Sequence, residues 1–125
     1  MDKFIIRATK TTPAVNFDPA IGVLTISGES YPENSADFYA PVFAWLNKYI
    51  ESKGSFVFHF KMVYFNTSSS KAILDIIDLL ENYYKNNGQV ELIWHYEEDD
   101  EDIMESGMEF TENLKMPSKI VSYTV

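Results

Sequence analysis

Four hydroxyl residues in succession, Thr67, Ser68, Ser69 and Ser70, occupy a polar break between two strongly patterned segments of the chain. One hydroxyl is enough to cap a helix N-terminus, so four exceed that requirement. The first turn of a helix carries unpaired amide N–H groups and the positive end of the helix dipole, and both favour a phosphate group. Because phosphorylation places about −1.5 to −2 units of charge at one point, this break is a candidate phosphorylation site. An ordinary helix cap is the alternative interpretation.

The flanking segments place this break between a strand and a helix. Residues 55–65 (SFVFHFKMVYF) are rich in aromatic and β-branched residues, which predicts a central strand whose even-numbered residues, Phe56 to Tyr64, share one face. From Lys71 the apolar residues follow helical spacing, in a stripe of Ile73, Ile76, Ile77, Leu80 and Tyr84. The hydroxyl run therefore lies where a strand leads into a helix, a place where α/β sheets often present their ligands.

The rest of the pattern predicts one α/β domain over residues 1–125, with a mixed β-sheet, an N-terminal hairpin and about three helices. The hairpin joins residues 12–17 and 23–28 through a turn that contains Pro and Gly. A helix follows, for which Ser30 and Glu33 have capping-box spacing and Asn34 and Ser35 are alternative caps. The later expected elements are the end of that helix at Gly54, a strand at 90–96, a helix at 103–114 and an edge strand at 120–125.

Composition limits the classes of partner. The chain has 46% hydrophobic residues and no cysteine, so a folded core without disulfides or thiolate chemistry is expected. Its net charge of −9 repels phosphate backbones and anionic lipid, which argues against nucleic acid and membrane partners. The start of the chain has charges within its apolar stretch, unlike a signal peptide, so we expect a cytoplasmic protein.

Two other groups of residues could do chemistry. The acidic run Glu97 to Asp102 suggests an alternative function, a small-ligand or divalent-metal-binding α/β module, although it lacks the glycine and the ligand spacing of an EF-hand loop. Adjacent acids are more typical of a solvated loop before a helix. His59 and His95 lie on separate predicted strands, and neither belongs to a catalytic triad pattern. No phosphate-binding glycine motif occurs, so no enzyme activity, cofactor or metal is expected.

Three segments of this chain resemble the SiaC family of bacterial regulatory phosphoproteins: TPAVNFDPAIGVLTISGESYPENSADFYAPVFAWLNKYI, VYFNTSSSKAILDIIDLLE and VELIWHYEEDDEDIMESGMEF. The GESYPEN and YFNTSSSK stretches are the most specific parts. The resemblance implies a fold similar to anti-sigma-factor antagonists and STAS domains, and a protein that is not an enzyme. It also implies phosphorylation by a dedicated threonine kinase and reversal by a PP2C-type phosphatase. The unphosphorylated form would bind a diguanylate cyclase and promote synthesis of cyclic di-GMP.

The resemblance also assigns roles to particular residues. Thr67 is the implied phosphoacceptor. Its expected surround within the motif is Asn66, Ser68, Ser69, Ser70 and Lys71. Four residues from the preceding strand-to-helix turn are expected beside it at the same sheet edge and, with that surround, are candidates for partner binding: Tyr31, Pro32, Glu33 and Asn34.

Overall fold

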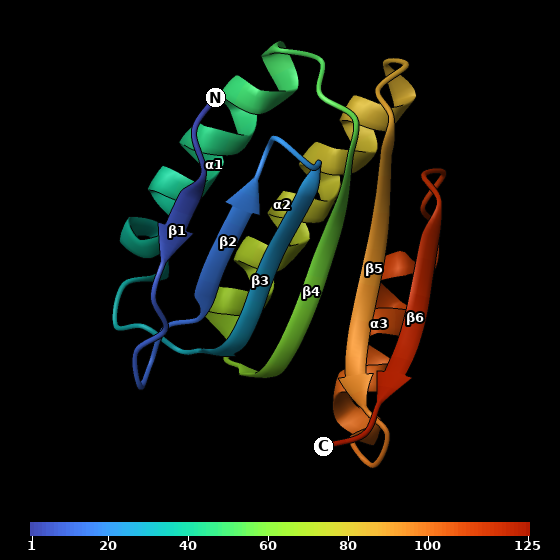
Figure 1. Cartoon of the computed structure of the whole chain (residues 1–125). Helices are drawn as coiled ribbons and strands as arrows, with labels where there is room; N and C mark the ends of the chain where they lie inside the picture. The colour runs from blue at the N-terminus through green and yellow to red at the C-terminus, as the bar shows by residue number, and fades with distance from the viewer.

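The six strands of the sheet lie side by side in the order in which they occur in the chain, and three helices cover one face (Figure 1). The computed structural model describes all residues, 1–125. The elements are β1 (Phe4–Ile6), β2 (Ala14–Asp18), β3 (Val23–Ser30), α1 (Ser35–Glu51), β4 (Phe56–Phe65), α2 (Thr67–Lys85), β5 (Val90–Glu97), α3 (Glu101–Thr111) and β6 (Ser118–Tyr123). The predicted mixed sheet with about three helices is confirmed.

Pairing directions divide the sheet into two parts. β1, β2 and β3 pair antiparallel, and the predicted hairpin is β2–β3, to which β1 adds a third strand. β3 to β6 pair parallel. Each β–α–β connection moves one strand further in the same direction, so the right-handed crossover rule places all three helices on one face. The carboxyl ends of β3, β4, β5 and β6 consequently meet at one edge.

The core lies between the sheet and the helices, and large aromatic residues dominate it. Phe17, Phe58, Phe60 and Trp94 are fully buried. Their rings form a continuous series of contacts with centroid separations of 5.5 Å between Phe17 and Phe58, 4.8 Å between Phe58 and Phe60, and 5.6 Å between Phe60 and Trp94. Burial of each such side chain contributes about 1.5–3 kcal/mol, which a chain without disulfides needs.

A β-bulge near the end of β4 changes which residues face the helices. The pairing of β3 with β4 steps from Gly28–Met62 to Glu29–Tyr64, so the intervening residue of β4 has no partner. Beyond the bulge Phe65 packs on the buried Trp94 ring, whereas Tyr64 is 51% exposed. The prediction that Tyr64 shares the inner face is therefore wrong, because strict alternation does not anticipate an extra residue.

The N-terminus of α1 agrees with one of the predicted caps, whereas its C-terminus does not lie where the sequence predicted. Asn34 is the N-cap, and its side chain accepts a hydrogen bond from the amide of Asp37, as one of the alternatives proposed. The predicted stop at Gly54 is wrong, since the helix ends at Glu51 and Lys53 takes the left-handed backbone conformation with φ 60. Gly54 serves a different purpose: a Cβ there would lie 2.5 Å from the Tyr49 ring.

The starts of three other elements, and the side of α2 on which Tyr84 lies, also differ from the sequence-based predictions. α2 begins at Thr67 rather than Lys71, and α3 and β6 each begin two residues earlier than predicted. Tyr84 is 36% exposed and so does not belong to the buried stripe of α2. In its place Tyr83 packs on the sheet, with its ring stacked on Phe56 and its hydroxyl donating to the Gly54 carbonyl at 2.6 Å.

Glu81 is a buried carboxylate that joins α2 to the segment before β6. Its two oxygens accept hydrogen bonds from the amides of Lys115 at 2.7 Å and Met116 at 2.9 Å. Glu81→Gln would turn an NH₂ group toward one of these N–H donors and leave it unpaired. We expect a loss of about 1–3 kcal/mol in the free energy of unfolding, measured by urea denaturation. Glu105→Gln, at an exposed position, is the control, and an equal loss there would contradict this role for Glu81.

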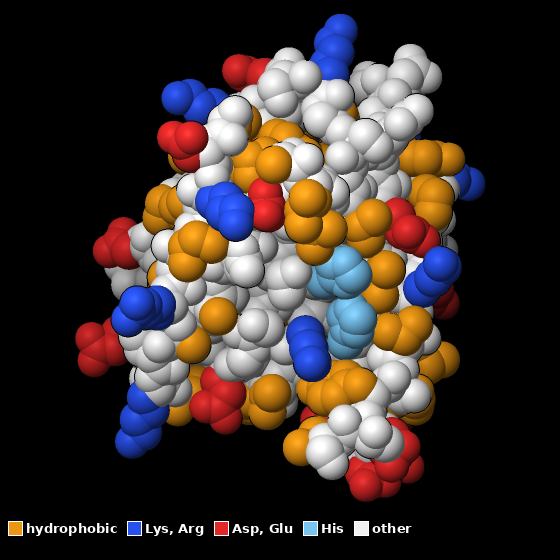
Figure 2. All heavy atoms as spheres, in the orientation of Figure 1, with side chains coloured by type: hydrophobic (Ala, Val, Ile, Leu, Met, Phe, Trp, Pro, Cys, Tyr) orange, Lys and Arg blue, Asp and Glu red, His pale blue; other side chains and the backbone are white.

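The other face of the sheet has no helical layer over it, and Figure 2 shows this face. Side chains that alternate with the core residues point to it, among them His59, Lys61 and Val63 from β4. His95 from β5 lies next to His59 near the middle of this open face, where the two imidazoles are visible side by side (Figure 2).

Candidate functional site

Two strand-to-helix turns meet at the carboxyl edge of the parallel strands. The first joins β3 to α1, and the second joins β4 to α2 through Asn66 alone. The amide of Asn66 donates to the carbonyl of Ser30 at 3.1 Å, which holds the turns together through the backbone. The rings of Tyr31 and Tyr64, one from each side, meet edge to face at 5.7 Å between centroids.

A network of hydroxyl groups connects the two turns beneath the surface. Ser30 Oγ is 2.7 Å from the Tyr39 hydroxyl and 2.8 Å from Ser69 Oγ. Ser35 Oγ is 2.9 Å from Ser68 Oγ and 3.3 Å from Ser69 Oγ. All of these residues except Ser68 are buried. Burial raises the pKa of Tyr39, although its hydrogen bonds act in the opposite direction, so the phenol stays neutral. The network fixes α1 and α2 relative to each other.

Asn66 is the N-cap of α2. Its Oδ1 accepts hydrogen bonds from the amide of Ser69 at 2.9 Å and the hydroxyl of Ser68 at 3.1 Å. We expect Asn66→Ala to lower the free energy of unfolding by about 1 kcal/mol, whereas Asn66→Asp keeps the acceptor and most of the stability. Thermal unfolding of the two variants measures the difference, and equal melting temperatures would contradict the capping role.

Thr67 is the first residue of α2, and it is exposed. As the first two helical residues, Thr67 and Ser68 present amide N–H groups that have no partner within the helix. No hydrogen bond of this turn involves the Thr67 hydroxyl, whereas Ser68 is bonded to Ser35 and Asn66. Ser69 is fully buried and Ser70 is half-buried. The four hydroxyls therefore differ, and Thr67 is the one that is both exposed and uncommitted.

The structure brings the predicted neighbours to the same edge. Tyr31 and Pro32 are half-buried and Glu33 is exposed in the turn before α1, which Asn34 caps. Lys71 lies one helical turn beyond Thr67, exposed, with its ammonium 3.2 Å from the Asp75 carboxylate. Their part in partner binding stays a prediction.

Sequence reasoning missed Ser30, Ser35 and Tyr39 as members of the hydroxyl network. A signal for Ser30 was present, because it follows Leu24 and Ile26 at the inward-facing positions of β3. A polar residue at such a position needs a buried partner. Ser69 gives the same signal in α2, since it lies four residues before Ile73 on the buried stripe.

A groove between α1 and α2 opens beside this turn, with a volume of ≈ 400 Å³. Its floor is apolar, and it joins the exposed helix start to the hydroxyl network. The lining residues are Ser35, Ala36, Tyr39, Phe43, Ser68, Lys71, Ala72 and Asp75.

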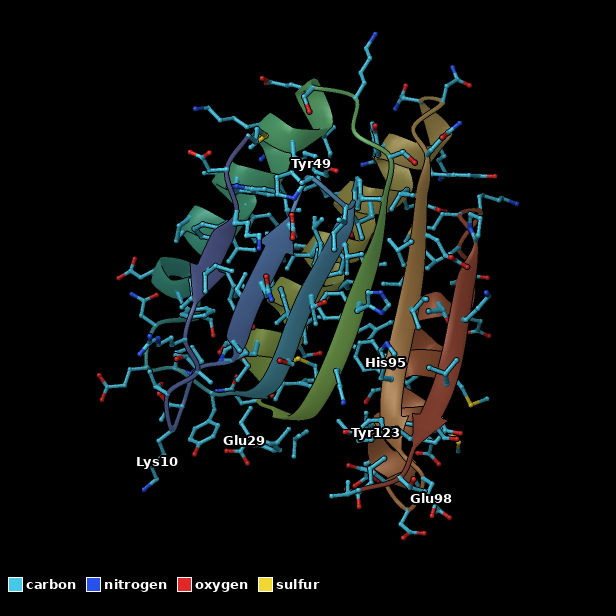
Figure 3. All side chains as sticks on the ribbon, in the orientation of Figure 1. Lys10, Glu29, Tyr49, His95, Glu98 and Tyr123 are labelled. Atoms are coloured by element: carbon cyan, nitrogen blue, oxygen red, sulfur yellow. The ribbon has the colours of Figure 1, made fainter.

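The acidic run spans the end of β5, the turn after it and the start of α3. Five of its carboxylates surround a shallow hollow between Glu97 and Asp102, and Glu98 lies out on this loop near the C-terminus (Figure 3). Asp100 caps α3 by accepting a hydrogen bond from the amide of Ile103 at 3.1 Å. Nowhere in the chain do three or more His, Asp or Glu side chains converge as metal ligands. The geometry gives the metal-binding alternative no support.

A family model described as SiaC family regulatory phosphoprotein matches residues 6–123. This chain belongs to the SiaC family. It is 35% identical to an uncharacterized protein of Pseudomonas aeruginosa over 98% of both chains. Crystallographic apo-SiaC from the same organism superposes with a TM-score of 0.89 at 35% identity, covering 97% of this chain and 99% of that one. The SiaC chain of a complex with the diguanylate cyclase SiaD, where SiaC is named the activator, gives 0.91 at 35% identity over 96% and 99%.

Membership in the SiaC family makes this protein a regulatory phosphoprotein and not itself an enzyme, as the sequence predicted. The six-stranded sheet with three helices is the fold of the SiaC structures. The likeness to anti-sigma-factor antagonists stays a prediction. None of the three helices has the length and apolar character needed to cross a bilayer.

Proposed function

We propose that this chain is a phosphorylation-controlled activator of a diguanylate cyclase, and that Thr67 is its phosphoacceptor. The unphosphorylated form binds the cyclase and promotes synthesis of cyclic di-GMP. A dedicated threonine kinase blocks this by modifying Thr67, and a PP2C-type phosphatase reverses the modification. The close likeness to a SiaC chain solved with the cyclase that it activates supports the output side of this proposal.

The exposure of Thr67 at the first position of α2 is the observation that carries the proposal. A kinase needs a hydroxyl that it can reach, and Thr67 meets this requirement without breaking any hydrogen bond of the turn. Phosphorylation of Ser68 would break its hydrogen bonds to both Ser35 and Asn66. Ser69 lies in the interior, where a kinase cannot reach it. The unpaired amides at the helix start can then donate hydrogen bonds to the phosphate oxygens.

Phosphorylation prevents docking because the partner must remove water from the helix start. A neutral threonine tolerates this at small cost, whereas an uncompensated dianion costs several kcal/mol. The first two turns of α2 offer one cation, Lys71, which already pairs with Asp75 at 3.2 Å. The chain also carries a net charge of −9, so its overall electrostatic potential further disfavours an added negative charge.

The switch requires no refolding. The buried hydroxyl network and the Asn66 cap hold both turns in place, and neither uses the Thr67 hydroxyl. The modification therefore acts as a local change of charge at a preformed docking surface.

Peptide mapping of the protein purified from its own host tests the acceptor. We expect phosphate on the peptide that contains Thr67, loss of that phosphate in Thr67→Ala, and its persistence in Ser68→Ala. Treatment with a metal-dependent PP2C-type phosphatase should remove it. Phosphate found on another residue of the wild-type protein, or retained at this helix start in Thr67→Ala, would overturn the assignment.

A further inference from the structure

The only two histidines of the chain face each other from neighbouring strands. His59 is in β4 and His95 is in β5, on the open face of the sheet, where Figure 2 shows the imidazoles in contact and Figure 3 labels His95. His59 Nδ1 is 2.8 Å from His95 Nε2, and the ring centroids are 5.1 Å apart. These distances place both nitrogens on the line between the ring centres, so one ring donates an N–H group end-on to the lone pair of the other.

This hydrogen bond lies where the backbone pairing of β4 with β5 ends. The last backbone pair is Phe60–Trp94, although both strands continue beyond it. His95 follows Trp94 directly, and its ring reaches across to His59 on the other strand. On the open face, the bond between the two imidazoles therefore joins the strands at the end of their pairing. We call this place, Phe60 and Trp94 with the residues that follow them, the β4–β5 seam.

We propose that His59 and His95 form a proton-sensitive clasp at the β4–β5 seam, closed while the pair carries at most one positive charge and open when both rings are charged. A first added proton binds the outer nitrogen of the donor ring, and the hydrogen bond then becomes charge-assisted and stronger. A second proton has to take the acceptor lone pair, which would place two N–H groups and two positive charges against each other. The rings must then separate. The clasp does not involve Thr67, so it is independent of the function proposed above.

The surroundings of the two rings oppose full protonation. Burial lowers the pKa of both imidazoles, with Glu91 acting in the opposite direction at His59. His59 and Lys61 lower the pKa of His95 further. Glu91 is itself paired with Lys119 of β6 at 3.4 Å. The other charged or titratable residues on this face of β5 and β6 are Glu97 and Tyr123, and the residue of β3 that pairs with His59 is the uncharged Thr25.

The stability of the folded chain should follow the protonation of this pair. The folded pKa of each ring lies below the value of about 6.5 for a free imidazole, so the unfolded chain binds more protons in the range below it. The stabilisation from the pair is therefore complete above about pH 6.5 and is lost as the pH falls through the lowered values. Within that range the unfolding equilibrium constant should rise by up to about tenfold per pH unit for each ring.

NMR of protein labelled with ¹⁵N in its histidines tests the bond without any variant. Because His59 uses Nδ1 and His95 uses Nε2, one shared proton requires both neutral rings to be protonated on the same atom, either Nδ1 in both or Nε2 in both. We expect such matched tautomers at about pH 7.5 and two separate protonation steps on acidification, as interacting groups show. Opposite tautomers in the two rings, or two independent titrations at the ordinary imidazole pKa, would overturn the proposal.

Urea denaturation at about pH 7.5 and about pH 5.5 tests the effect on folding. Most carboxylates stay ionised over this range, so the histidines are the side chains that change charge. We expect the denaturation midpoint of the parent to fall on acidification. The midpoint of the double variant His59→Gln, His95→Gln should fall much less, because two amides can pair without titrating. An equal fall in the parent and the double variant, shown to be folded by circular dichroism, would contradict the clasp. The tautomer measurement on the parent decides the question if the double variant does not fold.

Discussion

Thr67→Glu is expected to weaken binding to the diguanylate cyclase of the same organism by about tenfold to a hundredfold. The carboxylate brings one negative charge to the exposed start of α2, where the proposed docking would remove water and where Lys71 is already paired with Asp75. A loss of about 1.4–2.8 kcal/mol corresponds to this change in the dissociation constant. Calorimetric titration of the cyclase with the parent and variant proteins measures it. Authentic phosphate carries more charge and should weaken binding further.

Two matched variants separate the effect of a charge at position 67 from the loss of the hydroxyl and from a change in overall charge. Thr67→Val removes the hydroxyl but keeps the branched shape and the neutral charge, so it should bind with nearly the parent affinity. Ser118→Glu adds the same charge at the start of β6, at the opposite end of the parallel strands, and should also bind normally. Equal weakening by Ser118→Glu would show that overall charge, and not the helix start, controls the interaction.

Gly107→Ala is expected to lower the free energy of unfolding by about 2–4 kcal/mol. Gly107 lies inside α3 against the buried Trp94, and a Cβ at this position would lie 2.3 Å from Trp94 Cδ1 and 2.6 Å from Trp94 Nε1. The indole has no room to retreat, because it is fully buried and donates to the Ile103 carbonyl at 2.9 Å. Helix propensity alone predicts the opposite sign, a gain of up to about 1 kcal/mol. Chemical denaturation decides between the two.

A double-mutant cycle tests whether Trp94 is the cause. Trp94→Ala removes Cγ, Cδ1 and Nε1, the indole atoms that the new methyl group would meet, so the added cost of Gly107→Ala in that background should largely disappear. Glu105→Ala, at an exposed position of the same helix, is the control for helix propensity and should change stability by less than about 0.5 kcal/mol. A stabilising Gly107→Ala in the parent protein would show that the packing against Trp94 is looser than the structure indicates.

Much of the architecture was predictable because local patterns decide it. The alternation in residues 55–65 and the helical spacing beyond Lys71 each depend on neighbours a few positions away. With the order of elements known, parallel pairing and crossover handedness bring the Thr67 turn and the Tyr31 to Asn34 turn to one edge. The candidate site followed from the hydroxyl run and from the resemblance to the SiaC family together.

What could not be predicted depends on contacts between distant residues. The bulge at the end of β4 exists because β3 and β4 pair out of step beyond Gly28, so Tyr64 was assigned to the wrong face. His59 and His95 are 36 positions apart, and nothing in either strand indicates that their rings meet. The commitment of Ser68 and Ser69 to Ser30 and Ser35, which leaves Thr67 free, is likewise a property of the assembled turns.

We propose that a single phosphate on Thr67 switches off an activator that otherwise stays folded. The most direct measurement is the rate of cyclic di-GMP formation by the diguanylate cyclase of the same organism, with the fully phosphorylated protein and with the same preparation after phosphatase treatment. We predict strong activation by the dephosphorylated protein and loss of activation by the phosphorylated one, with the same circular dichroism spectrum for both. Equal activation by both forms would rule out phosphorylation of Thr67 as the switch.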